Sequence, residues 1–262
     1  MIHRLMRCSC LVILLVPVSL SSARAAQAQQ TAELSNEQVK ERLSFVTNAL
    51  YSAQPRAQAW LDGWIAGYGA GAFVLGCLSK SHWNDVKPDG GNPPGQPLRD
   101  RDFAEDMLVG SVTCALGVGG MLINPFKPAY GPDKLRLMPE GAPEERRLKL
   151  LQAEELLRQC AKREKEGRGW LTHLLNLGVN AAAGLVTVVA FDRPWSDGVL
   201  TFVTSEAVSL LNIYTQPRRA IRDLNNYEVR YLGRPGAYLR APSDRPWYVS
   251  VYPGGLSVGI RF

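Results

Sequence analysis

Four apolar segments, each long enough to cross a lipid bilayer as a helix, limit what this chain can fold into. A loop rich in turn-forming Pro, Gly and Asp joins the first two segments, and the short connector Asp192-Arg193-Pro194-Trp195 joins the last two, so each pair is expected to form a helical hairpin. The sequence therefore predicts a mainly α-helical bundle. The four segments cover 57–78, 104–123, 170–191 and 198–214.

An amphipathic helix is predicted ahead of each apolar pair, over 35–51 and over 143–166. Ser35 and Gln38 have the spacing of a capping box, and Pro143 suits the first turn of a helix. Apolar residues recur at helical intervals along one face of each. These residues are Val39, Leu43, Val46 and Leu50 in the first helix and Leu150, Ala153, Leu157 and Cys160 in the second.

The order of these elements occurs twice, which favours an internal duplication. The units are 29–130 and 131–232, each an amphipathic helix followed by an apolar helical hairpin. Trp-Leu occurs at equivalent places, at Trp60 and Trp170, and the last helices align without gaps from Asp106 and Asp197. The identities are few, so chance similarity is the alternative.

The tail from 233 to 262 differs from both units. A linker rich in Pro, Gly and Arg comes first, over 233–246. Alternating apolar residues in 247–252 and 256–262 then flank Pro253-Gly254-Gly255, which predicts a short C-terminal β-hairpin.

The first 28 residues have the features of a cleavable secretory signal peptide. Arg4 and Arg7 precede an apolar core at 11–20, and small residues at Ala23 and Ala25 suit a cleavage site. The protein is therefore expected to be exported to the bacterial cell envelope; a retained membrane anchor is the alternative. Removing this segment takes away half of the formal net charge of +6, which disfavours a nucleic-acid partner.

Glycine is frequent in the apolar segments, although each helical Gly costs about 1 kcal/mol relative to Ala. Close helix packing explains this frequency, either within a membrane or in a tightly packed soluble bundle. The candidate helix-packing residues are Gly63, Gly67, Gly71, Gly110, Gly117, Gly120, Gly178 and Gly184. Tryptophans near the ends of the segments favour the membrane interpretation.

A few polar residues within the apolar segments form the candidate functional site. In a bilayer such groups usually face a bundle interior or a water-filled path. The alternative is that they only hydrogen-bond between helices. The candidates are Asp62, His173, Asn176, Asn180 and Glu206.

The sequence lacks the common motifs of catalytic, phosphate-binding or metal sites, so no catalytic residue, metal or cofactor is predicted. Three cysteines remain after residue 28, at Cys77, Cys114 and Cys160, and buried free thiols are favoured over a Cys77–Cys114 disulfide. The leading hypothesis is a non-enzymatic structural or interaction protein that associates with a membrane lipid or an envelope protein and forms homo-oligomers. A transport or pore component with a polar stripe along its path is the alternative.

The distribution of positive charge complicates the membrane interpretation. If the signal peptide is removed and four helices span the inner membrane, only five basic residues fall in the cytoplasmic loops, and twenty-two fall outside. This reverses the usual preference for positive charge on the cytoplasmic side. A simple four-span inner-membrane topology is therefore disfavoured, leaving a periplasmic bundle or membrane association after export.

Overall fold

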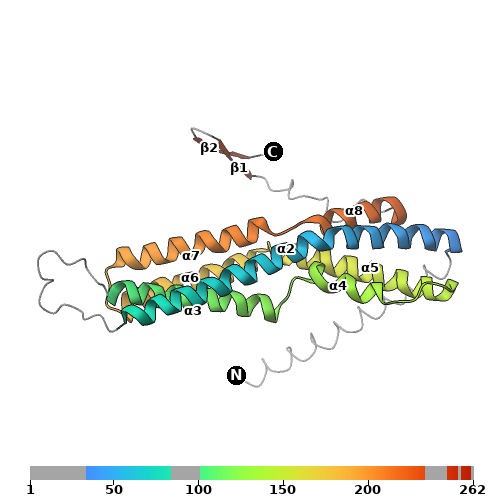
Figure 1. The fold of residues 1–262 in the computed structure, drawn as a ribbon. Coiled ribbons are helices and arrows are strands. Elements are labelled where there is room, and N and C mark those ends of the chain that lie inside the picture. Colours follow the sequence, from blue (N-terminus) through green and yellow to red (C-terminus); the bar gives the residue numbers. More distant parts are fainter. Residues whose placement is uncertain (1–33, 84–100, 234–246, 253–254, 261–262) are drawn as a thin grey trace, which may run out of the picture.

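The structure, a computed structural model, describes residues 34–83, 101–233, 247–252 and 255–260. This part is mainly helical, and the predicted helical bundle is confirmed (Figure 1). The helices are α2 (Asn36–His82), α3 (Arg101–Ile123), α4 (Lys127–Arg136), α5 (Pro143–Glu166), α6 (Trp170–Val189), α7 (Trp195–Thr215) and α8 (Arg219–Leu232).

Strands β1 (Trp247–Tyr252) and β2 (Gly255–Ile260) pair in an antiparallel register, with Trp247 opposite Ile260 and Tyr252 opposite Gly255. Several sequence predictions lie outside the described residues. They are the signal peptide at 1–28, most of the linker at 233–246, and the turn residues Pro253 and Gly254.

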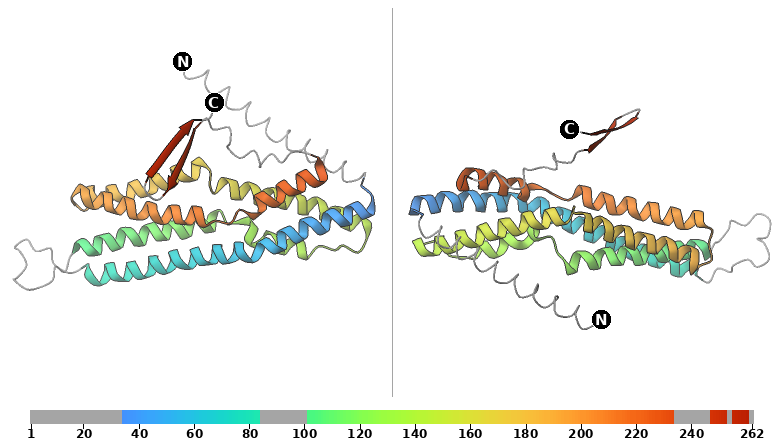
Figure 2. Two further views of the ribbon diagram at one scale, coloured as in Figure 1. Left: turned by 90° about the horizontal axis from the view of Figure 1, so that it is seen from above. Right: turned by 180° about the vertical axis from the view of Figure 1, so that it is seen from behind.

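The helices divide lengthwise into two regions, seen from three sides in Figures 1 and 2. The headpiece consists of residues 36–56 of α2 together with α4, α5 and α8. The apolar bundle consists of residues 57–82 of α2 together with α3, α6 and α7. Only α2 runs through both regions.

The headpiece has a conventional hydrophobic core. All eight apolar residues predicted to line the amphipathic faces of 35–51 and 143–166 are buried there, and the capping box is confirmed. The backbone N–H of Ser35 donates to Gln38 Oε1 at 2.9 Å, and that of Gln38 donates to Ser35 Oγ at 3.2 Å. Leu224 and Tyr227 of α8 complete this core.

The boundary predicted between 35–51 and 57–78 is wrong, because α2 continues through Pro55 as one helix. Proline removes one backbone hydrogen bond, but the buried face continues across it from Leu50 to Ala57 and Leu61. Burial on both sides of the proline therefore outweighs the lost bond. The sequence also did not predict α4 and α8 as separate helices.

The apolar bundle consists of two helical hairpins, α2 with α3 and α6 with α7. Packing is close within each hairpin and sparse between them. At the end far from the headpiece, Arg193 joins the hairpins: its guanidinium lies 2.7 Å from Asp197, 3.6 Å from Asp106 and 3.7 Å from Asp102.

Three helical stretches are long and apolar enough to cross a membrane: Asn36–His82, Arg101–Arg136 and Trp170–Val189. The fourth apolar segment, in α7, does not meet the same criterion. Its polar residues explain the difference, because Thr204, Glu206 and Ser209 interrupt an otherwise apolar helix.

Candidate functional site

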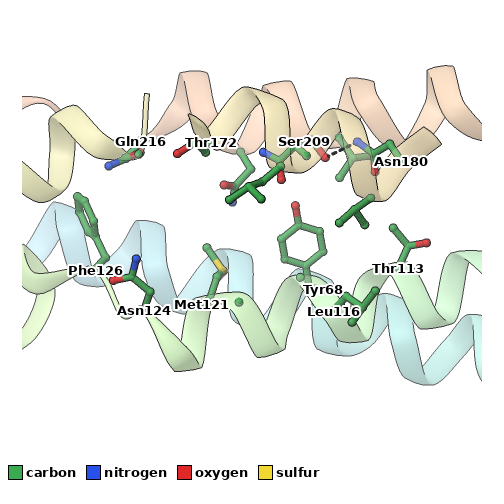
Figure 3. A pocket seen from close by; sticks show the side chains of 18 of the residues that line it. Tyr68, Thr113, Leu116, Met121, Asn124, Phe126, Thr172, Asn180, Ser209 and Gln216 are labelled. Atoms are coloured by element: carbon green, nitrogen blue, oxygen red, sulfur yellow. Dashed lines mark hydrogen bonds between the residues drawn. The ribbon is translucent and has the colours of Figure 1, made fainter. Parts of the chain in front are cut away.

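A large cavity separates the two hairpins of the apolar bundle. Its volume is about 1120 Å³, and it extends from the middle of the bundle to the headpiece. Figure 3 shows side chains of α6 and α7 facing Tyr68 of α2 and Leu116 and Met121 of α3 across this space. The cavity follows from the sparse packing between hairpins.

One wall of the cavity is polar. Asn180 of α6 donates its side-chain Nδ2 to Glu206 Oε2 at 2.7 Å and to Ser209 Oγ at 3.0 Å, which joins α6 to α7. Asn180 is 2% exposed, so these bonds satisfy a buried amide. Asn176 lines the same wall one helical turn away.

The structure brings together three of the five predicted site residues. Asn176 and Asn180 line the cavity, and Glu206 binds Asn180 beside it. His173 instead packs near Tyr214, with ring centroids 6.3 Å apart, and does not line the cavity. Asp62 is exposed on α2 and is also outside the lining.

A polar stripe along α7 and the residue that follows it, Gln216, was not predicted from the sequence. Four of its lining residues are spaced by four, three and four positions, so they fall on one helical face. That spacing is visible in the sequence, and it would have extended the candidate site along the whole cavity. The four residues are Ser205, Ser209, Asn212 and Gln216.

The end of the cavity beside the headpiece is basic. Lys162, Arg163 and Lys165 line it together with one acid, Glu166. Arg163 donates to the backbone oxygen of Asn124 at 2.9 Å, and burial lowers the pKa of its guanidinium. The cavity thus changes along its length from apolar and neutral polar walls to a charged end with net positive charge.

The predicted packing glycines separate into two groups. Four lie at close helix contacts: a Cβ at Gly71 would meet Cys114, at Gly110 Leu75, at Gly117 Tyr68, and at Gly184 the backbone of Gly198. At the other four, a Cβ would have no atom of the described residues within 4 Å. These are Gly63, Gly67, Gly120 and Gly178.

The cysteines and acidic groups show no metal-binding arrangement in the described residues. Cys77, Cys114 and Cys160 are all free. No three His, Cys, Asp or Glu side chains among residues 34–83 and 101–233 come together as potential ligands.

Comparison of the chain with protein-family models, with curated proteins and with solved structures finds no match.

Proposed function

We propose that this protein is a non-enzymatic structural or interaction protein of the cell envelope, held in a membrane by its apolar bundle. The observation that carries the proposal is where large apolar side chains are exposed. In the described residues, all but four of them belong to the apolar bundle; the exceptions are Tyr130, Leu137, Leu148 and Val229. Water-soluble monomers rarely expose apolar surface on this scale.

Aromatic residues mark two levels along the bundle that fit a bilayer. On α2, Trp64 and Trp83 are 19 residues apart, and on α7 so are Trp195 and Tyr214. At 1.5 Å per helical residue this is about 28 Å, close to the thickness of the hydrocarbon core. Aromatic side chains with a polar group favour these interfacial levels.

We propose export followed by membrane association. The expected signal peptide at 1–28 supports export, and the basic segments 29–56, 124–169 and 215–262 argue against ordinary inner-membrane insertion with the headpiece outside. Insertion from the periplasmic side, into the outer membrane or at its surface, avoids that conflict. The headpiece then lies in the periplasm.

Self-association is part of the proposal. Gly63 and Gly67 lie one turn apart on α2 without an intramolecular neighbour at the Cβ position among the described residues. Small residues at this spacing let two helices approach closely in a membrane. A second copy of the chain, or a helix of another envelope protein, is the partner that such a surface fits.

Alkaline carbonate extraction and thiol labelling test the membrane proposal. Cys77 is exposed on the apolar bundle, so lipid is expected to shield it from a membrane-impermeant maleimide. Gln152→Cys, at an exposed position of α5, is the matched headpiece control and is expected to react readily. Extraction by carbonate, or equal labelling of both thiols without detergent, contradicts membrane embedding.

A transport or pore component is the alternative function, and the polar wall of the cavity favours it. Asn176, Asn180 and Ser209 give a path through the bundle a hydrophilic side. Asn180→Leu removes the hydrogen bond to Glu206 and is expected to lower solute flux in proteoliposomes. Leu185→Ala, on the exposed surface of α6, is the control and is expected to leave solute flux unchanged. Equal flux in both variants and the unmodified protein argues against transport.

We also propose that the two halves, 29–130 and 131–232, arose by duplication and that 247–260 forms a hairpin. In the predicted alignment Ala129 of α4 corresponds to Ala220 of α8, and both are buried, at 2% and 3% exposure. Each follows a helix of an apolar hairpin. Ala220 packs in the headpiece core, and Ala129 packs in a neighbouring cluster with Ala57, Leu61 and Phe126. An alignment of related chains that fails to align the halves would contradict the duplication.

A further inference from the structure

A second pocket lies where the apolar bundle meets the headpiece. Its volume is about 650 Å³, and it is formed by α2, the end of α7, the start of α8 and the connection between α5 and α6. Five arginines line it: Arg56, Arg168, Arg218, Arg219 and Arg222. They come from segments far apart in the sequence, so only the folded chain brings them together.

Two of these arginines are fixed by hydrogen bonds. Arg219 donates to the backbone oxygen and the hydroxyl of Ser52, at 3.1 and 2.7 Å. Arg168 donates to the backbone oxygens of Tyr214 and Gln216, at 2.8 and 2.7 Å. These bonds shape the pocket. Arg219 also pairs with Asp223, its Nε lying 3.2 Å from Oδ2, so its charge is compensated. Both acceptors of Arg168 are neutral backbone oxygens, so its charge is not.

The other three arginines are available to a ligand. Arg56, Arg218 and Arg222 are exposed and make no hydrogen bond or ion pair with the described residues. Glu164 lines the same pocket, but its two oxygens accept the backbone N–H groups of Ala220 and Ile221. The pocket therefore has excess positive charge facing open space.

Repulsion among the arginines adds to this argument. Burial and the nearby charge of Arg218 lower the pKa of the Arg168 guanidinium. An anion bound among these arginines would relieve this repulsion.

The position of the pocket indicates where that anion comes from. Trp60 and Trp64 both donate their indole N–H to Thr215 Oγ1, at 3.2 and 3.1 Å, and Thr215 lines the pocket. Tryptophan at the end of an apolar bundle marks the headgroup level of a bilayer. Phosphate groups of lipids lie at this level, and arginine binds phosphate through paired N–H groups.

We propose that the arginine pocket binds the phosphate of an anionic phospholipid headgroup, with Arg56, Arg218 and Arg222 as its ligands. This inference rests on the proposed membrane location. A bound lipid of this kind connects the headpiece to the bilayer surface, because α2, α7 and α8 all meet at the pocket. It gives the protein a preference for anionic membranes.

The test measures thermal unfolding of the full chain in a non-ionic detergent during titration with short-chain lipids. Dioctanoyl phosphatidylglycerol is the probe, with dioctanoyl phosphatidylcholine and inorganic phosphate as comparisons. The variant R56Q/R218Q/R222Q removes the free arginines. The control variant K40Q/K134Q/R136Q removes the same charge from exposed positions of the headpiece that do not line the pocket, and exposed ion pairs such as those of Lys40 and Arg136 contribute little.

We expect phosphatidylglycerol to raise the melting temperature of the unmodified and control proteins. Each lost arginine–phosphate contact weakens binding about tenfold. The triple arginine variant should therefore need about a thousandfold more lipid if the three losses are independent, and at least about tenfold more if they are not. If the triple variant does not fold, the single variant R218Q replaces it in the titration, and R218Q is expected to weaken lipid binding less than the triple substitution does.

Three results would overturn the assignment. They are an equal response of the arginine and control variants, an equal response to phosphatidylcholine, and a response to inorganic phosphate as strong as that to the lipid. The last identifies a free phosphate site instead. Because the measurement is made in detergent, its failure is separate from failure of membrane embedding, which carbonate extraction tests.

Discussion

A close backbone contact between α6 and α7 makes a quantitative prediction about Gly184. A Cβ at this position would lie 2.5 Å from the backbone oxygen of Gly198 and 3.3 Å from the Cβ of Phe202. A backbone atom cannot rotate away as the end of a side chain can. Gly184→Ala therefore forces α6 and α7 apart.

Gly178→Ala is the matched control on the same helix. Nothing in the described residues lies within 4 Å of a Cβ at Gly178. Both substitutions gain the same intrinsic helix propensity, about 1 kcal/mol, so this gain cancels when the variants are compared. The remaining difference is the steric cost at Gly184, about 1–3 kcal/mol for an overpacked contact.

Thermal unfolding of both variants in the same detergent measures that difference. For a chain of this size, about 1 kcal/mol shifts the melting temperature by about 2–4 °C. We expect Gly184→Ala to melt several degrees below Gly178→Ala. Equal melting temperatures would refute the close approach of α6 and α7 at Gly184 and Gly198.

The headpiece gives three further predictions. Leu157 is 1% exposed, and Leu157→Ala should lower the free energy of unfolding by about 2–5 kcal/mol in urea titrations. Leu148 is 60% exposed, and Leu148→Ala should change the free energy of unfolding by less than about 0.5 kcal/mol. Burial raises the pKa of Glu164 from 4.5 to about 7, so the folded headpiece binds this proton more tightly than the unfolded chain. The free energy of unfolding should then fall as pH rises between these values, and Glu164→Gln should flatten that slope in denaturant titrations at several pH values. Cys160 is fully buried, and burial raises the pKa of its thiol to about 12. A maleimide should therefore modify Cys160 only as the headpiece unfolds. Rapid labelling of Cys160 in the folded protein would contradict this.

Local patterns predicted the helices well. The spacing of Val39, Leu43, Val46 and Leu50 identified a face that is buried in the headpiece, because a helix places residues three and four apart on one side. The capping residues at Ser35 and Gln38 were predicted for the same local reason. Helix α8 was missed although its buried residues, Leu224 and Tyr227 among them, also recur at helical spacing.

The candidate site was predicted only in part, because its members lie on different helices. Asn176 and Asn180 share a face of α6, which the sequence indicates directly. Asp62 is on another helix, so whether it reaches the cavity depends on how α2 is rotated in the bundle. His173 shares the face of α6 with Asn176 and Asn180 but packs near Tyr214, and the structure leaves both Asp62 and His173 outside the cavity. The arginine pocket depends even more on tertiary contacts, since Arg56 and Arg218 are separated by most of the chain.

The sequence by itself determined the local properties of this protein: where helices form, which faces are apolar, and which segments suit a membrane. These depend on residues within a few turns of each other. Only the tertiary structure decided that α2 runs through both regions, that the two hairpins leave a cavity between them, and that only half of the predicted packing glycines lie at helix contacts. Those features depend on how helices cross and rotate against one another, and local spacing does not specify that.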